Sequence, residues 1–280
     1  MFHRSTVLVA LAAAVLLLAA GPAPAAVPKR IVSLSPTTTE TLFAIGAGRQ
    51  VVAVDDQSNY PRRAPRTSLS GYTPNVEAIA GYRPDLVILA FDANDAVAGL
   101  RKLGIKVLLQ PAAKDLSGAY VQIRQLGVLT GHRKAAVALV ARMRKAIVKA
   151  VRAVPKRQLN VYHELTPDLY SATSRTFIGR IYKLFRLRNI ADAADSTGSG
   201  YPQLSGEYIV SANPRLIVLA DTRCCGQSAA TVSTRPGWSG IAAVRTRSIV
   251  AIDDSVASRW GPRIVQFVQA VAKVLKRKGV

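Results

Sequence analysis

His163 and the adjacent pair Cys224-Cys225 have the residue types that could bind a metal. The other two histidines are His3, near the N-terminus, and His132, in a helical stretch. A zinc or manganese site needs several His and carboxylate ligands, so His163 could supply only one axial ligand to iron or cobalt. The alternative is a hydrogen-bonded structural histidine. Three states are possible for the two cysteines: a vicinal disulfide, free thiols, or a thiolate that serves as an axial ligand.

Hydrolysis is the competing chemistry. Four serines have the right type for a nucleophile: Ser33, Ser35, Ser70 and Ser205. None of them lies in a nucleophile elbow, and His163 has no evident serine partner in the sequence. No glycine motif of the phosphate-binding kind is present. We therefore expect a binding protein with no catalytic residues, and an exported hydrolase stays the minor alternative.

An internal repeat defines the organisation of the chain. The segment Ser70-Gly71-Tyr72, Glu77, Ile79, Pro84 and Leu86 to Ala90 recurs as Ser199-Gly200-Tyr201, Glu207, Ile209, Pro214 and Leu216 to Ala220. Glu77 and Glu207 are 130 residues apart, and the residues that follow keep this offset. Each copy predicts a short helix with its Glu in the first turn, followed by a buried parallel strand. Two similar units are therefore expected.

Alternating strands and helices surround each copy. Strands are expected at 31–34, 51–54, 86–90, 106–109, 159–163, 216–220 and 249–252, and the clearest helices at 39–47, 95–103, 176–185 and 260–278. Such alternation favours parallel sheets covered on both faces. The stretch 120–154 is predicted to be helical except at Gly131, and Pro155 ends it. The fold class is thus α/β, with two Rossmann-like lobes joined by a long rigid helix.

The first residues predict export. His3 and Arg4 precede an apolar run from Val7 to Ala20 and then small residues, which is the layout of a signal peptide. We expect a signal peptide at 1–26, an N-terminal lobe at 27–118, a connecting helix at 119–155 and a C-terminal lobe at 156–280. The protein would then act in the periplasm, or at the outer face of the cytoplasmic membrane or in the cell wall.

The net charge is +22, which raises the question of a nucleic-acid partner. Export argues against that partner, and the basic residues are spread along the chain. The densest run is 133–152, where seven Lys and Arg residues and no acid accompany an apolar helix face. A solvated face is the simplest interpretation. Attraction to an anionic membrane surface or cell wall is the alternative.

Several motifs occur in a fixed order along the chain: the segments 31–40 (IVSLSPTTTE), Tyr60-Pro61, Asn75-Val76-Glu77, 84–87 (PDLV) and 259–263 (RWGPR). Together they resemble the Fe/B12 periplasmic-binding family, and the resemblance extends from Lys29 to the end. The resemblance implies a monomeric binding protein, with two lobes and no cofactor of its own, that serves an ABC permease. Its cargo would be a cobalt or iron chelate: vitamin B12, a ferric siderophore or haem.

The ligand is expected between the lobes, at the carboxyl ends of the strands. Loops there supply the candidate ligand-binding residues Tyr60, Tyr72, Phe91, His163, Tyr170, Arg259 and Trp260. Aromatic walls suit a macrocycle. By resemblance, Arg259 matches a ligand-contacting arginine, whereas Gly71 replaces a tryptophan of the B12-binding proteins. The resemblance favours a corrinoid over a siderophore, and either over haem, which stays the alternative cargo; a haem buffer without a permease is a further one.

The resemblance also implies how the permease is met. In the B12-binding proteins, one surface Glu on each lobe contacts arginines of the two-fold permease, and Glu77 and Glu207 occupy those positions. Charge-assisted pairs with arginine are strong and directional, so one carboxylate per lobe suits a symmetric dimer. The alternative is that each Glu only stabilises the start of its own helix.

Overall fold

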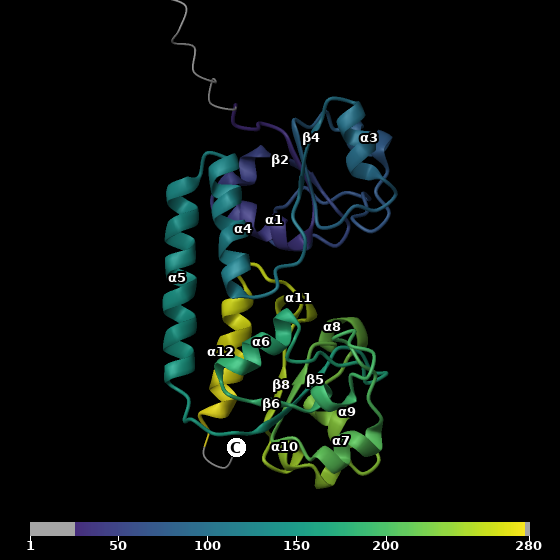
Figure 1. Cartoon of the computed structure of the whole chain (residues 1–280), viewed down its shortest axis with the longest axis vertical. Coiled ribbons are helices and arrows are strands. Elements are labelled where there is room, and N and C mark those ends of the chain that lie inside the picture. Colours follow the sequence, from purple (N-terminus) through teal and green to yellow (C-terminus); the bar gives the residue numbers. More distant parts are fainter. Residues whose placement is uncertain (1–25, 278–280) are drawn as a thin grey trace, which may run out of the picture.

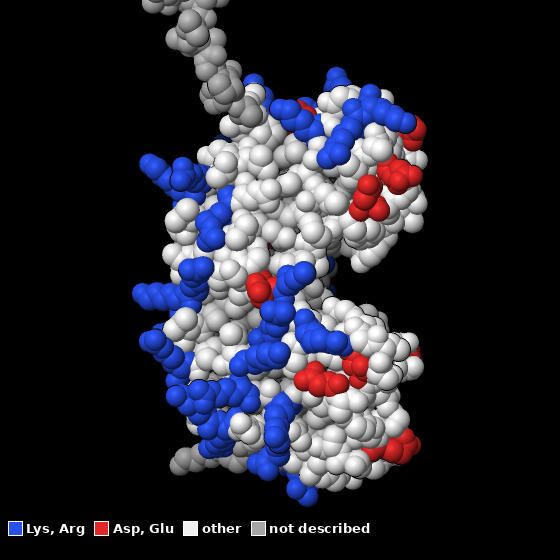
Figure 2. Space-filling model, in the orientation of Figure 1, with Lys and Arg blue, Asp and Glu red and all other residues white. Residues whose placement is uncertain are grey.

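The computed structural model describes residues 26–277. The expected signal peptide therefore lies almost wholly outside the described residues. Two α/β lobes are stacked along one long helix, and the molecule is hollowed between them on the side away from that helix (Figures 1 and 2).

The N-terminal lobe contains a four-stranded parallel sheet in the order β2-β1-β3-β4. Every residue of strands β1 and β3 is buried, and all of them except Ser33 are apolar. This is expected for the centre of a sheet covered on both faces. Its elements are β1 (Ile31–Leu34), α1 (Pro36–Ala44), η1 (Ala47–Gln50), β2 (Val51–Val54), α2 (Val76–Gly81), β3 (Leu86–Leu89), α3 (Ala96–Lys102) and β4 (Lys106–Leu109).

The C-terminal lobe repeats this topology, with the order β6-β5-β7-β8 and parallel pairing throughout. Its strands are β5 (Asn160–Glu164), β6 (Arg188–Asn189), β7 (Leu216–Leu219) and β8 (Ile249–Ala251). Its helices are α6 (Phe177–Leu184), η2 (Ile190–Ala194), α7 (Gly206–Ala212), α8 (Thr222–Cys225), α9 (Ala229–Ser233), η3 (Trp238–Gly240), α10 (Ala242–Arg245), α11 (Asp254–Ala257) and α12 (Ile264–Leu275). The predicted fold class is confirmed, and the two-residue strand β6 was not anticipated.

The segment expected to form one connecting helix folds differently. It forms α4 (Leu116–Leu129) and α5 (Arg133–Arg152), which lie side by side, and only α5 extends from one lobe to the other (Figure 1). The chain reverses at Gly131, whose φ is 76°. The two helices approach so closely that a Cβ on Gly127 would lie 2.3 Å from the Ala136 Cβ. The predicted break at Gly131 is thus a helical hairpin.

One hydrophobic core joins the two lobes. It runs from β1 and α1 through α4 and α5 to α12, with Ile123, Met143, Ile147 and Phe267 among its buried members. Helix α12 packs beside α5 in line with α4 (Figure 1). Because this core is continuous, moving one lobe against the other would expose apolar surface, which is costly. The expected rigid connection is therefore present, although three helices provide it.

Candidate functional site

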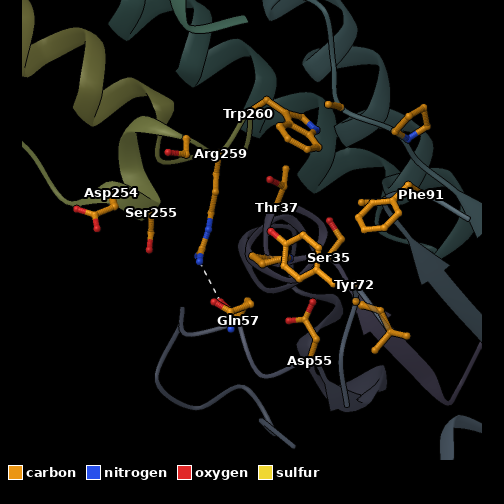
Figure 3. Close-up of a pocket in the computed structure, with 17 residues that line it drawn as sticks. Ser35, Thr37, Asp55, Gln57, Tyr72, Phe91, Asp254, Ser255, Arg259 and Trp260 are labelled. Atoms are coloured by element: carbon orange, nitrogen blue, oxygen red, sulfur yellow. Dashed lines mark hydrogen bonds between the residues drawn. The ribbon is translucent and has the colours of Figure 1, made fainter. Parts of the chain in front are cut away.

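A cavity of about 520 Å³ lies between the lobes, at the carboxyl ends of the N-terminal strands (Figure 3). From β1 the chain continues to β2 on one side of it, whereas the next strand, β3, lies on the other side. The strand order therefore reverses at β1, and a crevice opens between the carboxyl ends of β1 and β3. Leu34, Ala90 and Phe91 line the cavity at that point. The C-terminal lobe contributes Asp254, Ser255, Ser258, Arg259 and Trp260.

Three aromatic residues form walls of this cavity, and all three were among the candidate ligand-binding residues. The rings of Tyr72 and Phe91 are 5.7 Å apart at 45°, and they are 68% and 42% exposed. Trp260 faces them from the other lobe (Figure 3), and its indole N–H donates a 2.9 Å hydrogen bond to the Gln122 side chain on α4. Large aromatic rings left open to solvent in a cleft are typical of a ligand site.

Arg259 lines the cavity but is already engaged by the protein. Its guanidinium donates to Glu40 Oε1 at 2.8 Å, to Asn59 Oδ1 at 2.9 Å and to the Gln57 carbonyl at 2.9 Å. Arg263 also donates to Glu40, at 2.6 and 2.9 Å. Two arginines thus share one carboxylate, and the Asp55 and Asp254 side chains line the same cavity.

Glu40 is the member of this cluster that sequence reasoning missed. It belongs to α1 in the N-terminal lobe, whereas both arginines precede α12 in the other lobe, so the cluster ties the lobes together. The Glu40 side chain is 1% exposed, against 13% for Arg259 and 12% for Arg263. The sequence shows Glu40 only as a glutamate among threonine and apolar residues near the start of an expected helix. A glutamate at such a position could equally have faced solvent, so the sequence did not indicate a buried ion pair.

Asp55 adds a buried carboxyl group to the cavity wall. It follows β2, and its Oδ1 atom has no hydrogen-bond partner among the described residues. Burial raises the pKa of Asp55 to about 6, although a hydrogen bond from Ser58 opposes the shift. Near neutral pH this group can therefore change between a donor and an acceptor.

Tyr60 and Tyr170 do not line this cavity in the described structure. Both rings are half exposed. The Tyr60 ring lies under the Arg263 guanidinium, 4.4 Å from the ring centroid, and so supports the Glu40 cluster from outside. Tyr170 forms an isolated β-bridge with Gln203 at the surface of the C-terminal lobe.

The prediction that His163 contacts the ligand or its metal is wrong. His163 is fully buried on β5, where it packs against Phe267, and its Nδ1 lies 2.5 Å from the Tyr182 hydroxyl. Burial lowers its pKa to about 3, so it is a neutral core residue. Its hydrogen-bond partner is a phenol and not the serine that a hydrolase would need.

In the C-terminal lobe, the carboxyl ends of the two central strands carry buried acidic groups. Glu164 ends β5 and receives two hydrogen bonds from Arg235, at 2.6 and 2.7 Å. Asp221 follows β7, is fully buried, and has no hydrogen-bond partner for either oxygen among the described residues. Burial and the neighbouring Glu164 carboxylate raise the pKa of Asp221 to about 7.

Cys224 and Cys225 form a disulfide at the end of α8, on the part of the C-terminal lobe that faces the cleft (Figure 1). The Asp254 carboxylate, which lines the cavity, accepts hydrogen bonds from the Arg223 and Cys224 amides at 3.0 and 2.8 Å. The disulfide turn is therefore coupled to the cavity wall. In this state neither sulfur is a free thiolate, so the vicinal disulfide is the alternative that the structure adopts.

Glu77 and Glu207 occupy equivalent places in the two lobes. Each is the second residue of its helix, after a capping Asn75 or Ser205, and both side chains are exposed. Backbone and Ser205 hydrogen bonds at the start of α7 lower the pKa of Glu207. The repeat thus places one exposed carboxylate on each lobe.

Two further properties bear on function. Within residues 26–277, no three His, Cys, Asp or Glu side chains are grouped to hold a metal ion. Over the same residues, no helix has the length and apolar character needed to cross a bilayer.

Two lobes around a central cavity, joined by a rigid helical support, define a bilobed solute-binding protein. The chain belongs to the periplasmic binding protein family, whose model matches residues 31–256. Membership in this family places it outside the cytoplasm, as the sequence predicted.

Named relatives are consistent with that class. The chain is 34% identical over 258 residues to YvrC of Bacillus subtilis (strain 168), an "uncharacterized ABC transporter substrate-binding lipoprotein", covering 88% of this chain and 79% of that protein. It is 34% identical over 255 residues to the cobalamin-binding protein of Halobacterium salinarum, covering 88% and 69%. Among solved structures, the periplasmic haem-binding protein HutB of Vibrio cholerae aligns with a TM-score of 0.77 and 24% identity, covering 89% and 99%. This last likeness concerns the fold.

Proposed function

We propose that the protein binds a cobalt or iron chelate, preferentially a corrinoid, in the cavity between its lobes and delivers it to an ABC importer. The observation that carries the proposal is the open aromatic cavity formed by Tyr72, Phe91 and Trp260 at the junction of the lobes. Aromatic faces stack well on planar macrocycles. The relative named as cobalamin-binding, at 34% identity, supports the corrinoid among the candidate chelates.

The charge beside the cavity fits a ligand with an anionic periphery. Arg259 lines the cavity, and it shares the Glu40 carboxylate with Arg263. A phosphate or carboxylate on the chelate would accept a hydrogen bond from Arg259, since an arginine donates well to either group.

On the cavity wall formed by Gly71 and Tyr72, the aromatic ring comes from Tyr72, because position 71 has no room for a side chain. A Cβ at Gly71 would lie 2.9 Å from the Leu34 carbonyl oxygen and 3.0 Å from Asp55 Oδ2. A larger side chain at that position would therefore push the wall apart. Tyr72, the next residue, presents its ring to the cavity instead.

The repeat supplies a matched pair of variants to test the cavity. Tyr72 and Tyr201 are equivalent in the two lobes and both exposed, but only Tyr72 lines the cavity. Purified protein is titrated with cyanocobalamin, hemin, and ferric hydroxamate and catecholate siderophores, and absorbance is followed. Tyr72→Ala should weaken binding of the preferred chelate about tenfold through loss of one aromatic contact. Tyr201→Ala should leave the affinity unchanged, and equal losses would contradict a cargo site at this cavity.

Haem is the second candidate, because the exposed Tyr72 phenol is a group that can ligate haem iron. The same titration separates the two cargoes. A new absorbance band with hemin that Tyr72→Phe abolishes would assign haem. Tight binding of cyanocobalamin that survives Tyr72→Phe would assign a corrinoid, since the phenol oxygen would not touch the metal.

Docking on the permease is proposed to use Glu77 and Glu207. Their exposed carboxylates on matching helices suit arginines of a two-fold partner. The double variant Glu77→Ala, Glu207→Ala should bind the chelate normally and fail to stimulate uptake by the permease in proteoliposomes. Glu77→Gln, Glu207→Gln tests whether charge rather than shape is needed. Normal uptake with the Ala double variant would remove the docking role and leave cargo binding intact, whereas normal uptake with the Gln double variant alone would mean that docking does not need the charge.

A further inference from the structure

A basic groove of about 570 Å³ lies between α5 and the C-terminal end of α12. Its cations are Arg142, Lys145 and Lys149 on α5, and Lys273 and Lys276 on and just after α12. Alanines 146, 150, 153 and 272 form most of the remaining lining. Small side chains there leave room for a chain to lie between two rows of ammonium and guanidinium groups.

Within the part of the chain that the structure describes, no acidic group pairs with the cations of the groove. Neither α5 nor α12 contains an Asp or Glu. None of the five cations takes part in a salt bridge with the acidic residues at 26–277. Arg142, Lys145 and Lys149 are three and four residues apart, so their charges repel along one face of the helix and destabilise it. An anion in the groove would remove that repulsion.

The groove also lies apart from the helices that carry the proposed permease contacts. Figure 2 shows Lys and Arg side chains gathered along the α5 side of the molecule, whereas the acidic side chains in view lie mostly on the opposite side. Helix α7, which carries Glu207, and helix α3 lie away from α5 (Figure 1). Helix α2, with Glu77, packs on α3 through Val76 and Gly99.

We propose that the basic groove binds a linear polyanion of the cell envelope, a polymer with repeating phosphate groups. The three α5 cations extend over about 10 Å of helix, at 1.5 Å per residue. The other two face them across the groove, so successive anionic groups of one chain can be held from both sides. Lysines act as point charges on phosphate oxygens without requiring one geometry, which suits a flexible polymer. The proposal is independent of the identity of the cargo.

Inorganic polyphosphate is the probe, and binding is measured by fluorescence anisotropy at several salt concentrations. The groove variant is Lys145→Gln, Lys149→Gln, Lys276→Gln. The matched control is Arg101→Gln, Lys102→Gln, Lys106→Gln, which removes the same charge from exposed positions on α3 and β4. The groove variant should lose about tenfold or more in affinity, and the slope of log K against log salt should fall by about 2. The control should stay within about twofold of the parent.

Three results would overturn the proposal. Equal losses in both variants would mean that net charge alone attracts the polymer. No binding of polyphosphate at physiological salt would mean that the groove is a solvated surface. Binding of anionic phospholipid vesicles without binding of polyphosphate would assign the surface to a membrane. Unchanged melting temperatures and unchanged chelate binding in both variants confirm that the fold and the interlobe cavity are intact.

Discussion

The Glu40 cluster offers the sharpest test of how the lobes are held together. In Glu40→Gln the side chain keeps its shape, loses its charge and can accept fewer hydrogen bonds from two arginines. Arg259 and Arg263 would then face each other with little solvent, since their side chains are only 13% and 12% exposed. Removing one partner of a buried ion pair costs about 3–5 kcal/mol, because a buried charge loses its compensation.

That loss corresponds to a fall in melting temperature of about 6–20 °C for a chain of this size. Unfolding is followed by circular dichroism with heat and with urea. Arg223→Ala is the control, because the Arg223–Asp253 ion pair is exposed and its loss should cost under about 1 kcal/mol. A Glu40→Gln protein within about 1 kcal/mol of the parent would refute the reasoning, since solvent would then reach the cluster.

Three further outcomes follow from individual positions. Gly179→Ala should lower the free energy of unfolding in urea by about 3 kcal/mol, because its Cβ would lie 2.0 Å from the Thr173 carbonyl oxygen. Gly81→Ala is the control: there is open space around Gly81, so this substitution should be neutral or slightly stabilising. Asp221 has its pKa raised from 3.8 to about 7, so its protonated form is the one that stabilises the fold, and this contribution is lost as pH rises from about 4 through 7. Asp221→Asn should therefore gain stability relative to the parent as pH rises through this window, and a constant difference in urea unfolding would contradict the shift. Asp254→Ala removes the acceptor for two α8 amides and should speed hydrogen exchange at residues 223 and 224; unchanged exchange would contradict the coupling of the disulfide turn to the cavity wall.

The sheets could be predicted from the sequence because buried parallel strands are continuous apolar runs. Leu86–Leu89 and Leu216–Leu219 lie at the centres of their sheets with every residue buried. The repeat then determined the rest, since a second copy of the same strand and helix pattern implies a second lobe. Strand β6 has only two residues and lacks any such run, so nothing in the sequence marked it.

The direction of the chain at Gly131 could not be predicted. Glycine indicates a break in a helical pattern, but the angle between two helices depends on how closely their surfaces approach. Here Gly127 and Ala136 allow the backbones to come together, so the chain reverses. The helical pattern of a single segment does not show which other helix that segment will pack against.

Four of the candidate ligand-binding residues, Tyr72, Phe91, Arg259 and Trp260, line the cavity, whereas His163 lies in the core. The strand was predicted to end at His163, but β5 continues to Glu164. In a central strand of a parallel sheet covered on both faces, the residues are buried, and the crevice is reached by residues at and beyond the carboxyl end of the strand. A one-residue difference in the strand end therefore decides between a core position and a ligand contact. Residues after the strand, such as Phe91 after β3, were placed correctly.

The central claim is that a chelate binds between the lobes beside Trp260, and Trp fluorescence tests it most directly. The chain has two tryptophans, and Trp238 is buried in the C-terminal core, so Trp238→Phe leaves Trp260 as the reporter. Titration with cyanocobalamin, or with hemin if that is the cargo, should quench this fluorescence saturably and raise the melting temperature by mass action. Unchanged Trp260 fluorescence and stability with every chelate would contradict the claim.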